Sequence, residues 1–175
     1  GFYFVTVCSN AGENIFGEYK IPVGAGLVSA RSSEGASARN NDTVSDNDFV
    51  LSTVGTIIES QWLDIPKQYD NVELDEYVIM PNHIHGIIVI NHTKKRADTR
   101  PAPTISDIIC SFKSRSSVEY FRYIKRNNLD PCGKIWQRSF YDHVIRNERS
   151  LNAIREYILD NPVNWQQDIE NLLKL

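Results

Sequence analysis

Two histidines lie one residue apart in the segment His83-Ile84-His85. The Ile- and Val-rich run that continues to residue 90 predicts a strand, and on a strand a spacing of two places both imidazoles on one face, with Ile84 on the other. Two imidazoles arranged in this way can bind one metal ion. Because such pairs also occur as ordinary surface or core residues, the motif alone leaves both interpretations open.

A tyrosine and an asparagine, Tyr157 and Asn161, lie four residues apart in a predicted C-terminal helix. Residues at this spacing are neighbours on one helical face, so a nucleophilic phenol and an amide oxygen could serve one site. The alternative is a core tyrosine followed by an asparagine that caps the helix before Pro162. A following proline also disfavours helical dihedrals at Asn161.

These residues need a scaffold in which a strand and a distant helix meet. Hydrophobic periodicity predicts, in order, a strand at 2–8, a helix at 49–63, strands at 72–80 and 83–90, a helix at 104–125, strand material at 134–137 and 142–145, and a helix from Asn147 to Asn161. The two segments 134–137 and 142–145 are either two strands or one bent strand.

This order predicts an α+β fold of the ferredoxin-like type (βαββαβ), with an antiparallel sheet, helices on one side and an added C-terminal helix that carries Tyr157. The strand at 2–8 should be interior, and the strands at 72–80 and 83–90 should form a hairpin. Thr104 is expected to cap its helix together with Asp107.

A chain of 175 residues with 41% hydrophobic content is long enough for one domain and short for two. We therefore expect a single domain over 1–175 with a flexible Gly/Ser/Asn-rich insertion at about 23–48. No apolar run approaches the length of a membrane span, and three cysteines without a close pair indicate no disulfide framework. A cytoplasmic protein is expected, with an upstream segment before the strand that starts at residue 2.

The net charge of −3 conceals an uneven distribution. Residues 93–155 contain 14 Lys/Arg against 6 Asp/Glu, which leaves +8 in that window and −11 elsewhere. Basic side chains interleaved with aromatic rings are typical of a surface that binds single-stranded nucleic acid, although solvated helix faces and core aromatics give the same composition. The candidate phosphate contacts are Lys94, Lys95, Arg96, Lys113, Arg115, Arg122, Lys125, Arg126 and Arg138.

Three ordered blocks carry a family resemblance: residues 77–87 (YVIMPNHIHGI), 135–148 (IWQRSFYDHVIRNE) and 157–163 (YILDNPV). Together they resemble the REP-associated tyrosine transposases, a group of IS200-like single-tyrosine HUH transposases. The resemblance extends from about residue 2 to residue 165, apart from the insertion.

The resemblance implies that Tyr157 is the catalytic nucleophile and that His83, His85 and Asn161 bind the metal. Two imidazoles and an amide oxygen suit Mg²⁺, for which Mn²⁺ should substitute. The implied reaction cleaves single-stranded DNA beside a hairpin, forms a 5′-phosphotyrosine and transfers the strand to another 3′-hydroxyl. A monomer or a homodimer, associated with the nucleoid during action, is expected.

Three alternatives remain at this point. Tyr141 is a rival nucleophile, but it falls in the aromatic block of the family pattern instead of the helix before Asn161. The chain could also be a catalytically silent DNA-hairpin-binding protein. Finally, the histidine pair could activate water for ordinary hydrolysis, which would leave no covalent protein–DNA adduct.

Overall fold

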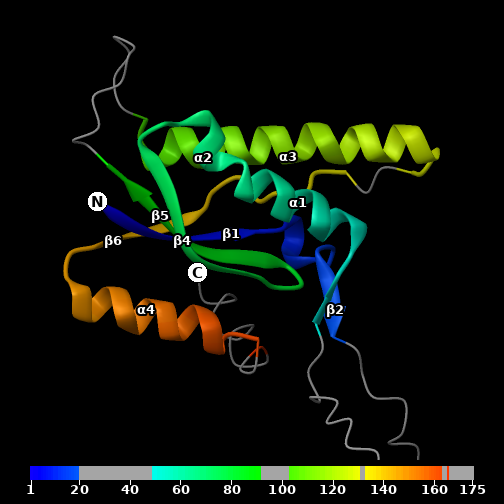
Figure 1. Ribbon diagram of the computed structural model, residues 1–175. Coiled ribbons are helices and arrows are strands. Elements are labelled where there is room, and N and C mark those ends of the chain that lie inside the picture. Colours follow the sequence, from blue (N-terminus) through cyan, green and yellow to red (C-terminus); the bar gives the residue numbers. More distant parts are fainter. Residues whose placement is uncertain (20–48, 92–102, 131–132, 163–164, 166–175) are drawn as a thin grey trace, which may run out of the picture.

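The computed structural model describes residues 1–19, 49–91, 103–130, 133–162 and 165 (Figure 1). Its four-stranded antiparallel sheet has the order β4-β5-β1-β6. The sheet strands are β1 (Phe2–Cys8), β4 (Val72–Ile79), β5 (His83–Ile90) and β6 (Tyr141–Ile145), and the main helices are α1 (Thr53–Leu63), α3 (Ile105–Asn127) and α4 (Glu148–Asp160).

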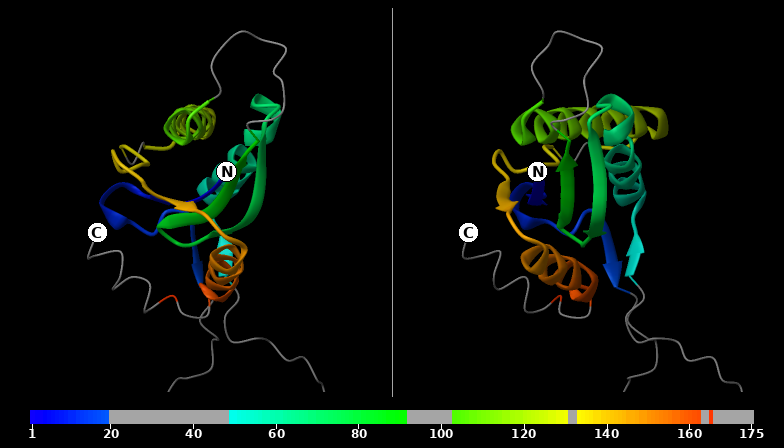
Figure 2. Two further views of the ribbon diagram at one scale, coloured as in Figure 1. Left: turned by 90° about the vertical axis from the view of Figure 1, so that its left-hand side faces the viewer. Right: turned by 60° about the vertical axis from the view of Figure 1, so that its left-hand side comes forward.

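This strand order, with α1 after β1 and α3 after β5, is the predicted ferredoxin-like arrangement. Helices α1 and α3 lie on one side of the sheet and α4 lies on the other (Figures 1 and 2). The predictions that β1 is interior and that β4 and β5 form a hairpin are confirmed.

Alternation along the strands divides the core into two clusters. On the side of α1 and α3, Val5 and Val7 of β1 pack with Ile84 and Ile88 of β5. On the side of α4, a smaller cluster is built from Ile87, Ile145, Leu151 and Ile158, with partly buried residues around it. The sheet therefore has a large structural face and a lightly covered face.

Gly86 allows close packing on the structural face. A Cβ at this position would lie 2.4 Å from Cζ2 of Trp62, which is fully buried in α1. The glycine between His85 and Ile87 thus permits the indole to lie directly against β5, and any side chain there would push α1 away from the sheet.

The prediction of one helix over 49–63 is wrong at its start. Residues Phe49–Leu51 form a short strand, β3, which pairs with β2 (Gly17–Tyr19) in a separate two-stranded sheet. Helix α1 begins at Thr53 because Ser52 caps it, its side chain accepting a hydrogen bond from the Gly55 backbone. Long-range pairing therefore outweighs the helical spacing of the first apolar residues.

Most other boundaries agree with the predicted elements. A 3₁₀ turn at Asn10–Gly12 follows β1, and Pro66 lies inside a short helix, α2 (Ile65–Gln68), directly after α1. The capping box of Thr104 and Asp107 is present at the start of α3. Of the two predicted strand segments, the second forms β6, whereas the first contributes only an isolated bridge between Trp136 and Ser9.

A register shift interrupts β4 between Leu74 and Tyr77. Leu74 and Tyr77 both pack on the structural face although they are three residues apart, so the shift corrects the two-residue alternation. Asp75 lies in this irregular stretch.

Two sets of predictions fall outside the described residues: the insertion at 23–48, and the loop that carries Lys94, Lys95 and Arg96. Within the described residues, no helix combines the length and hydropathy that crossing a membrane requires. Cys8 and Cys110 form no disulfide within the described part of the chain.

Candidate active site

Strand β5 places His83 and His85 on the face covered by α4, as the spacing of two predicts. The two side chains are 0% and 3% exposed, and their Nε2 atoms lie 3.0 Å apart. Ile84 between them is buried in the opposite cluster. Two imidazole nitrogens therefore meet at one point on the lightly covered face.

Each imidazole is oriented by a partner at its other nitrogen. Asn82 presents Oδ1 to His83 Nδ1 at 2.8 Å, and its own amide nitrogen donates to the Gly12 carbonyl. Because the carbonyl oxygen can only accept, His83 carries its proton on Nδ1, which leaves the Nε2 lone pair directed at the site. His85 Nδ1 lies 2.9 Å from the Thr6 hydroxyl, directly across the β1–β5 ladder.

Helix α4 places the phenol of Tyr157 at this pair. Its hydroxyl oxygen lies 3.3 Å from His85 Nε2, and its side chain is 42% exposed. The ring also packs edge-on against Phe4, which in turn stacks on His85. A potential nucleophile thus contacts one histidine of the pair, His85, while it remains open to a substrate.

Asn161 lies one turn beyond Tyr157 and is 2% exposed. Its Oδ1 is buried without a hydrogen-bond partner among the described residues, although buried amide oxygens are normally satisfied. The backbone keeps helical dihedrals (φ −57°, ψ −42°) despite the following proline, contrary to the usual preference. Beyond it, the Trp165 ring stacks on His83.

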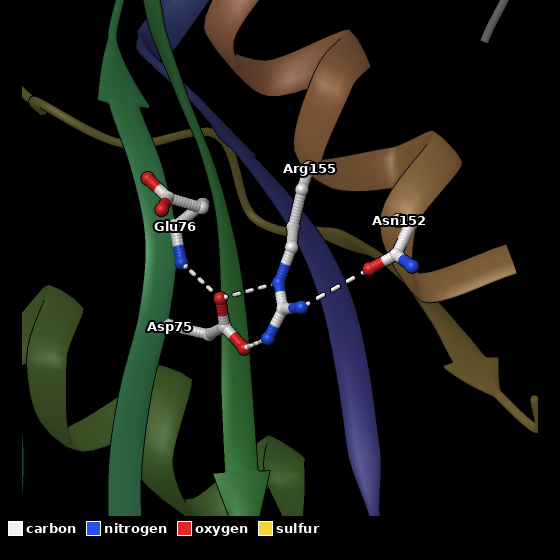
Figure 3. Close-up of polar contacts among 4 residues, drawn as sticks. All are labelled: Asp75, Glu76, Asn152 and Arg155. Carbon is white, nitrogen blue, oxygen red and sulfur yellow. Dashed lines mark hydrogen bonds and ion pairs between the residues drawn. The ribbon is translucent and has the colours of Figure 1, made fainter. Parts of the chain in front are cut away.

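An ion pair fixes the helix that carries Tyr157. Arg155 donates from Nε and Nη2 to the two carboxylate oxygens of Asp75, at 2.9 and 2.5 Å (Figure 3). Its third nitrogen, Nη1, donates to Asn152, and Asp75 Oδ1 also accepts from the Glu76 backbone. The irregular stretch of β4 therefore holds α4 through a planar two-point contact, which is more directional than a lysine pair.

This pair predicts a pH dependence of stability. The hydrogen bonds from Arg155 hold the pKa of Asp75 below its ordinary value of 3.8. A lowered folded-state pKa contributes stability above the unfolded value, and this contribution disappears as the pH falls through the folded value. Asp75→Asn should lower the melting temperature by a few degrees at pH 7. In thermal denaturation at decreasing pH, the difference in melting temperature between Asp75→Asn and the unmodified protein should shrink below about pH 4. A difference that persists at pH 2 would contradict this assignment.

The predicted phosphate contacts at 113–126 belong to α3, which lies on the side of the sheet opposite α4, the helix that carries Tyr157 (Figure 2). Lys113 donates to the carbonyls of Gln137 and Ser139, and burial lowers its pKa. Arg115 contacts Gln61, and Arg122 pairs with Glu119. Lys125, Arg126 and Arg138 are exposed. These residues remain predictions as DNA contacts, and the structure does not bring them to the site.

Several neighbours of the site were not predicted from the sequence. They are Phe4, Thr6, Asn82 and the pair of Asp75 with Arg155. Asn82 carries the only local signal, because it directly precedes His83 in a turn. No group of three or more His, Cys, Asp or Glu able to hold a metal occurs in the part of the chain that the structure describes. The predicted ligand set combines two histidines with an amide, and of these three side chains the structure shows the two imidazoles in contact.

Comparison with known proteins identifies the family of the chain. The family model for IS200-like transposases matches residues 49–161. An uncharacterized protein of Haemophilus influenzae is 31% identical over 96% of this chain and 83% of its own length. A REP-associated tyrosine transposase of Escherichia coli K12 is 29% identical, over 57% of this chain and 50% of that protein.

A solved structure described as a REP-associated tyrosine transposase bound to a REP hairpin has a similar fold. Its TM-score is 0.53 at 18% identity, covering 94% of this chain and 67% of that one. The family match spans the histidine pair and ends at Asn161. The chain therefore belongs to the IS200-like transposase family and is related to the REP-associated tyrosine transposases.

Proposed function

We propose that the chain is a metal-dependent endonuclease and strand transferase for single-stranded DNA, with Tyr157 as the nucleophile. The observation that carries this proposal is the contact of the Tyr157 hydroxyl with His85 Nε2 at 3.3 Å, beside the second imidazole of His83. A half-exposed phenol beside two imidazoles that can bind one metal ion is suited to attack on a phosphodiester.

The donor set fits a divalent ion. The Nε2 separation of 3.0 Å equals the spacing of about 3.0 Å expected for adjacent ligands at right angles around an ion with bonds of about 2.1 Å. The Oδ1 of Asn161, which is buried without a hydrogen-bond partner among the described residues, would supply a third, oxygen donor. His83, His85 and Asn161 would hold Mg²⁺, or Mn²⁺ in its place. When bound, such an ion would polarise a non-bridging phosphate oxygen and stabilise the charge of the transition state.

The chain's own groups perform the bond exchange. The Tyr157 oxygen forms a bond to phosphorus, the bond from phosphorus to the 3′ oxygen breaks, and the phenolic proton ends on that departing oxygen. The products are a 5′-phosphotyrosine and a free 3′-hydroxyl. Because the phosphotyrosine retains the ester bond, attack by another 3′-hydroxyl can rejoin strands without ATP.

The proposed substrate is single-stranded DNA that adjoins a hairpin. The support is the related transposase whose structure is described as bound to a REP hairpin. The exposure of Tyr157 also suits an extended strand. The number of subunits that act together stays a prediction of one or two.

A covalent-adduct assay tests the proposal. The unmodified protein is incubated with 3′-end-labelled hairpin oligonucleotides and Mn²⁺, and the products are separated on a denaturing gel. We expect a labelled protein band that protease removes. Cleavage without an adduct would favour water attack, and hairpin binding without cleavage would favour a silent DNA-binding protein.

Asn82 gives a further prediction. Asn82→Ala removes the acceptor that fixes the His83 tautomer, so we expect Mn²⁺ affinity to fall about 10- to 100-fold, as is usual when such supporting hydrogen bonds are lost. Asn82→Asp restores an acceptor and should recover most of the affinity. Calorimetric titration of the DNA-free protein measures both, and equal losses in the two variants would contradict the tautomer argument.

A further inference from the structure

Tyr141 lies on the same face of the sheet as the candidate active site. Its Cα pairs with Thr6 of β1, and Thr6 pairs with His85 of β5. Side chains directly opposite each other on neighbouring strands point to one face. Since strands are about 4.8 Å apart, Tyr141 lies about 10 Å across the sheet from His85.

Aromatic rings connect the two positions. Phe4 stacks on His85, contacts the Tyr157 ring at a centroid distance of 6.1 Å and contacts the Tyr141 ring at 6.4 Å. Phe4 is only partly buried and Tyr141 is 44% exposed. An aromatic surface formed by Tyr157, Phe4 and Tyr141 therefore extends from α4 to β6, an edge strand of the four-stranded sheet.

A hollow of about 390 Å³ is lined by residues that follow Tyr141 in the chain, from β6 to the first turn of α4. The lining contains one cation, one imidazole, one carboxylate, two small polar side chains and one valine. These residues are Asp142, His143, Val144, Arg146, Asn147 and Ser150. Cationic and amide groups of this kind can contact the sugar–phosphate chain of a bound strand.

We propose that Tyr141, backed by Phe4, is a stacking site for a base of the single strand that passes Tyr157, with the neighbouring hollow receiving the adjoining nucleotide backbone. This inference rests on the proposed function, since it takes single-stranded DNA as the ligand. Base–aromatic stacking is tolerant of sequence because every base has a flat π face. The role of Tyr141 is thus binding through its ring, separate from the nucleophilic role of Tyr157.

Equilibrium binding of a fluorescent oligothymidylate tests this site without requiring cleavage. In a Tyr157→Phe background, Tyr141→Leu should weaken binding about 5- to 150-fold, the range measured for loss of one base–aromatic stack. Tyr141→Phe keeps the ring and should recover most of that loss. Phe121→Leu is the matched comparison, because Phe121 is 47% exposed on α3, on the opposite side of the sheet.

An oligonucleotide series with a single abasic position adds a second readout. Removal of the stacked base should weaken binding to the Tyr141-containing protein but not weaken it further in Tyr141→Leu. Three outcomes would overturn the inference: no binding by the parent protein, equal binding by Tyr141→Leu, or an equal loss in Phe121→Leu. These experiments measure binding and do not require cleavage. Failure to form a covalent adduct would therefore reject the proposed reaction, while the binding data would still test the role of Tyr141.

Discussion

Tyr157→Phe should abolish the covalent protein–DNA adduct and reduce strand cleavage at least about 10³-fold, because in the proposed reaction the phenolic oxygen itself forms the new bond to phosphorus. The substitution removes one oxygen from a side chain that is half exposed, and the ring contacts with Phe4 and His85 can remain. Folding and hairpin affinity should therefore be close to those of the unmodified protein. The measurement is a time course of cleavage and adduct formation on denaturing gels.

The same chemical change elsewhere provides the control. Tyr69→Phe also removes one phenolic oxygen, but Tyr69 packs against the cluster on the side of α1 and α3. It should leave adduct formation intact. If Tyr157→Phe still forms an adduct, the nucleophile is a different residue and the proposed reaction is wrong. Peptide mapping of the adduct would then decide whether Tyr141 is that residue.

Elements with strong local signals were predictable from the sequence. The alternation and β-branched content of residues 83–90 predicted β5, and the spacing of two predicted that His83 and His85 share a face. Thr104 and Asp107 predicted the start of α3. These features depend on residues close together in the chain, so the sequence contains the necessary information.

The remaining features depend on register between distant segments. Thr6 is an ordinary β-branched strand residue until β1 pairs with β5 and places its hydroxyl beside His85. Arg155 was one of many basic residues, and only the irregularity of β4 gives it a partner 80 positions away. The strand at Phe49–Leu51 was missed for the same reason, since its partner, Gly17–Tyr19, is separated from it in the chain by residues 20–48.

The contrast between Lys113 and Arg155 shows why charge alone could not identify the DNA contacts. Both lie in the basic window, yet Lys113 stabilises the turn at residues 137–139 and Arg155 holds α4. The amino-acid composition does not distinguish these two structural roles. Their positions on opposite sides of the sheet separate their roles (Figures 1 and 2).

His83→Ala should remove measurable Mn²⁺ binding and lower cleavage on the order of 10³-fold, comparable to loss of a main electrostatic contributor to a transition state. His83 is fully buried, its Nε2 is 3.0 Å from that of His85, and Asn82 fixes its tautomer. The expected loss is in metal binding, so hairpin affinity measured with EDTA present should change little. Calorimetry and Mn²⁺ electron paramagnetic resonance measure the first effect, and gel shifts measure the second.

Because His83→Ala also leaves a cavity on the face under α4, a second variant separates metal loss from unfolding. His83→Gln fills most of the volume, and its melting temperature should stay closer to that of the unmodified protein while Mn²⁺ affinity remains reduced. His143→Ala removes an exposed imidazole from β6 and should retain Mn²⁺ binding. Normal Mn²⁺ binding by folded His83→Gln would mean that the converging nitrogens are not a metal site, and that Tyr157 must act without one.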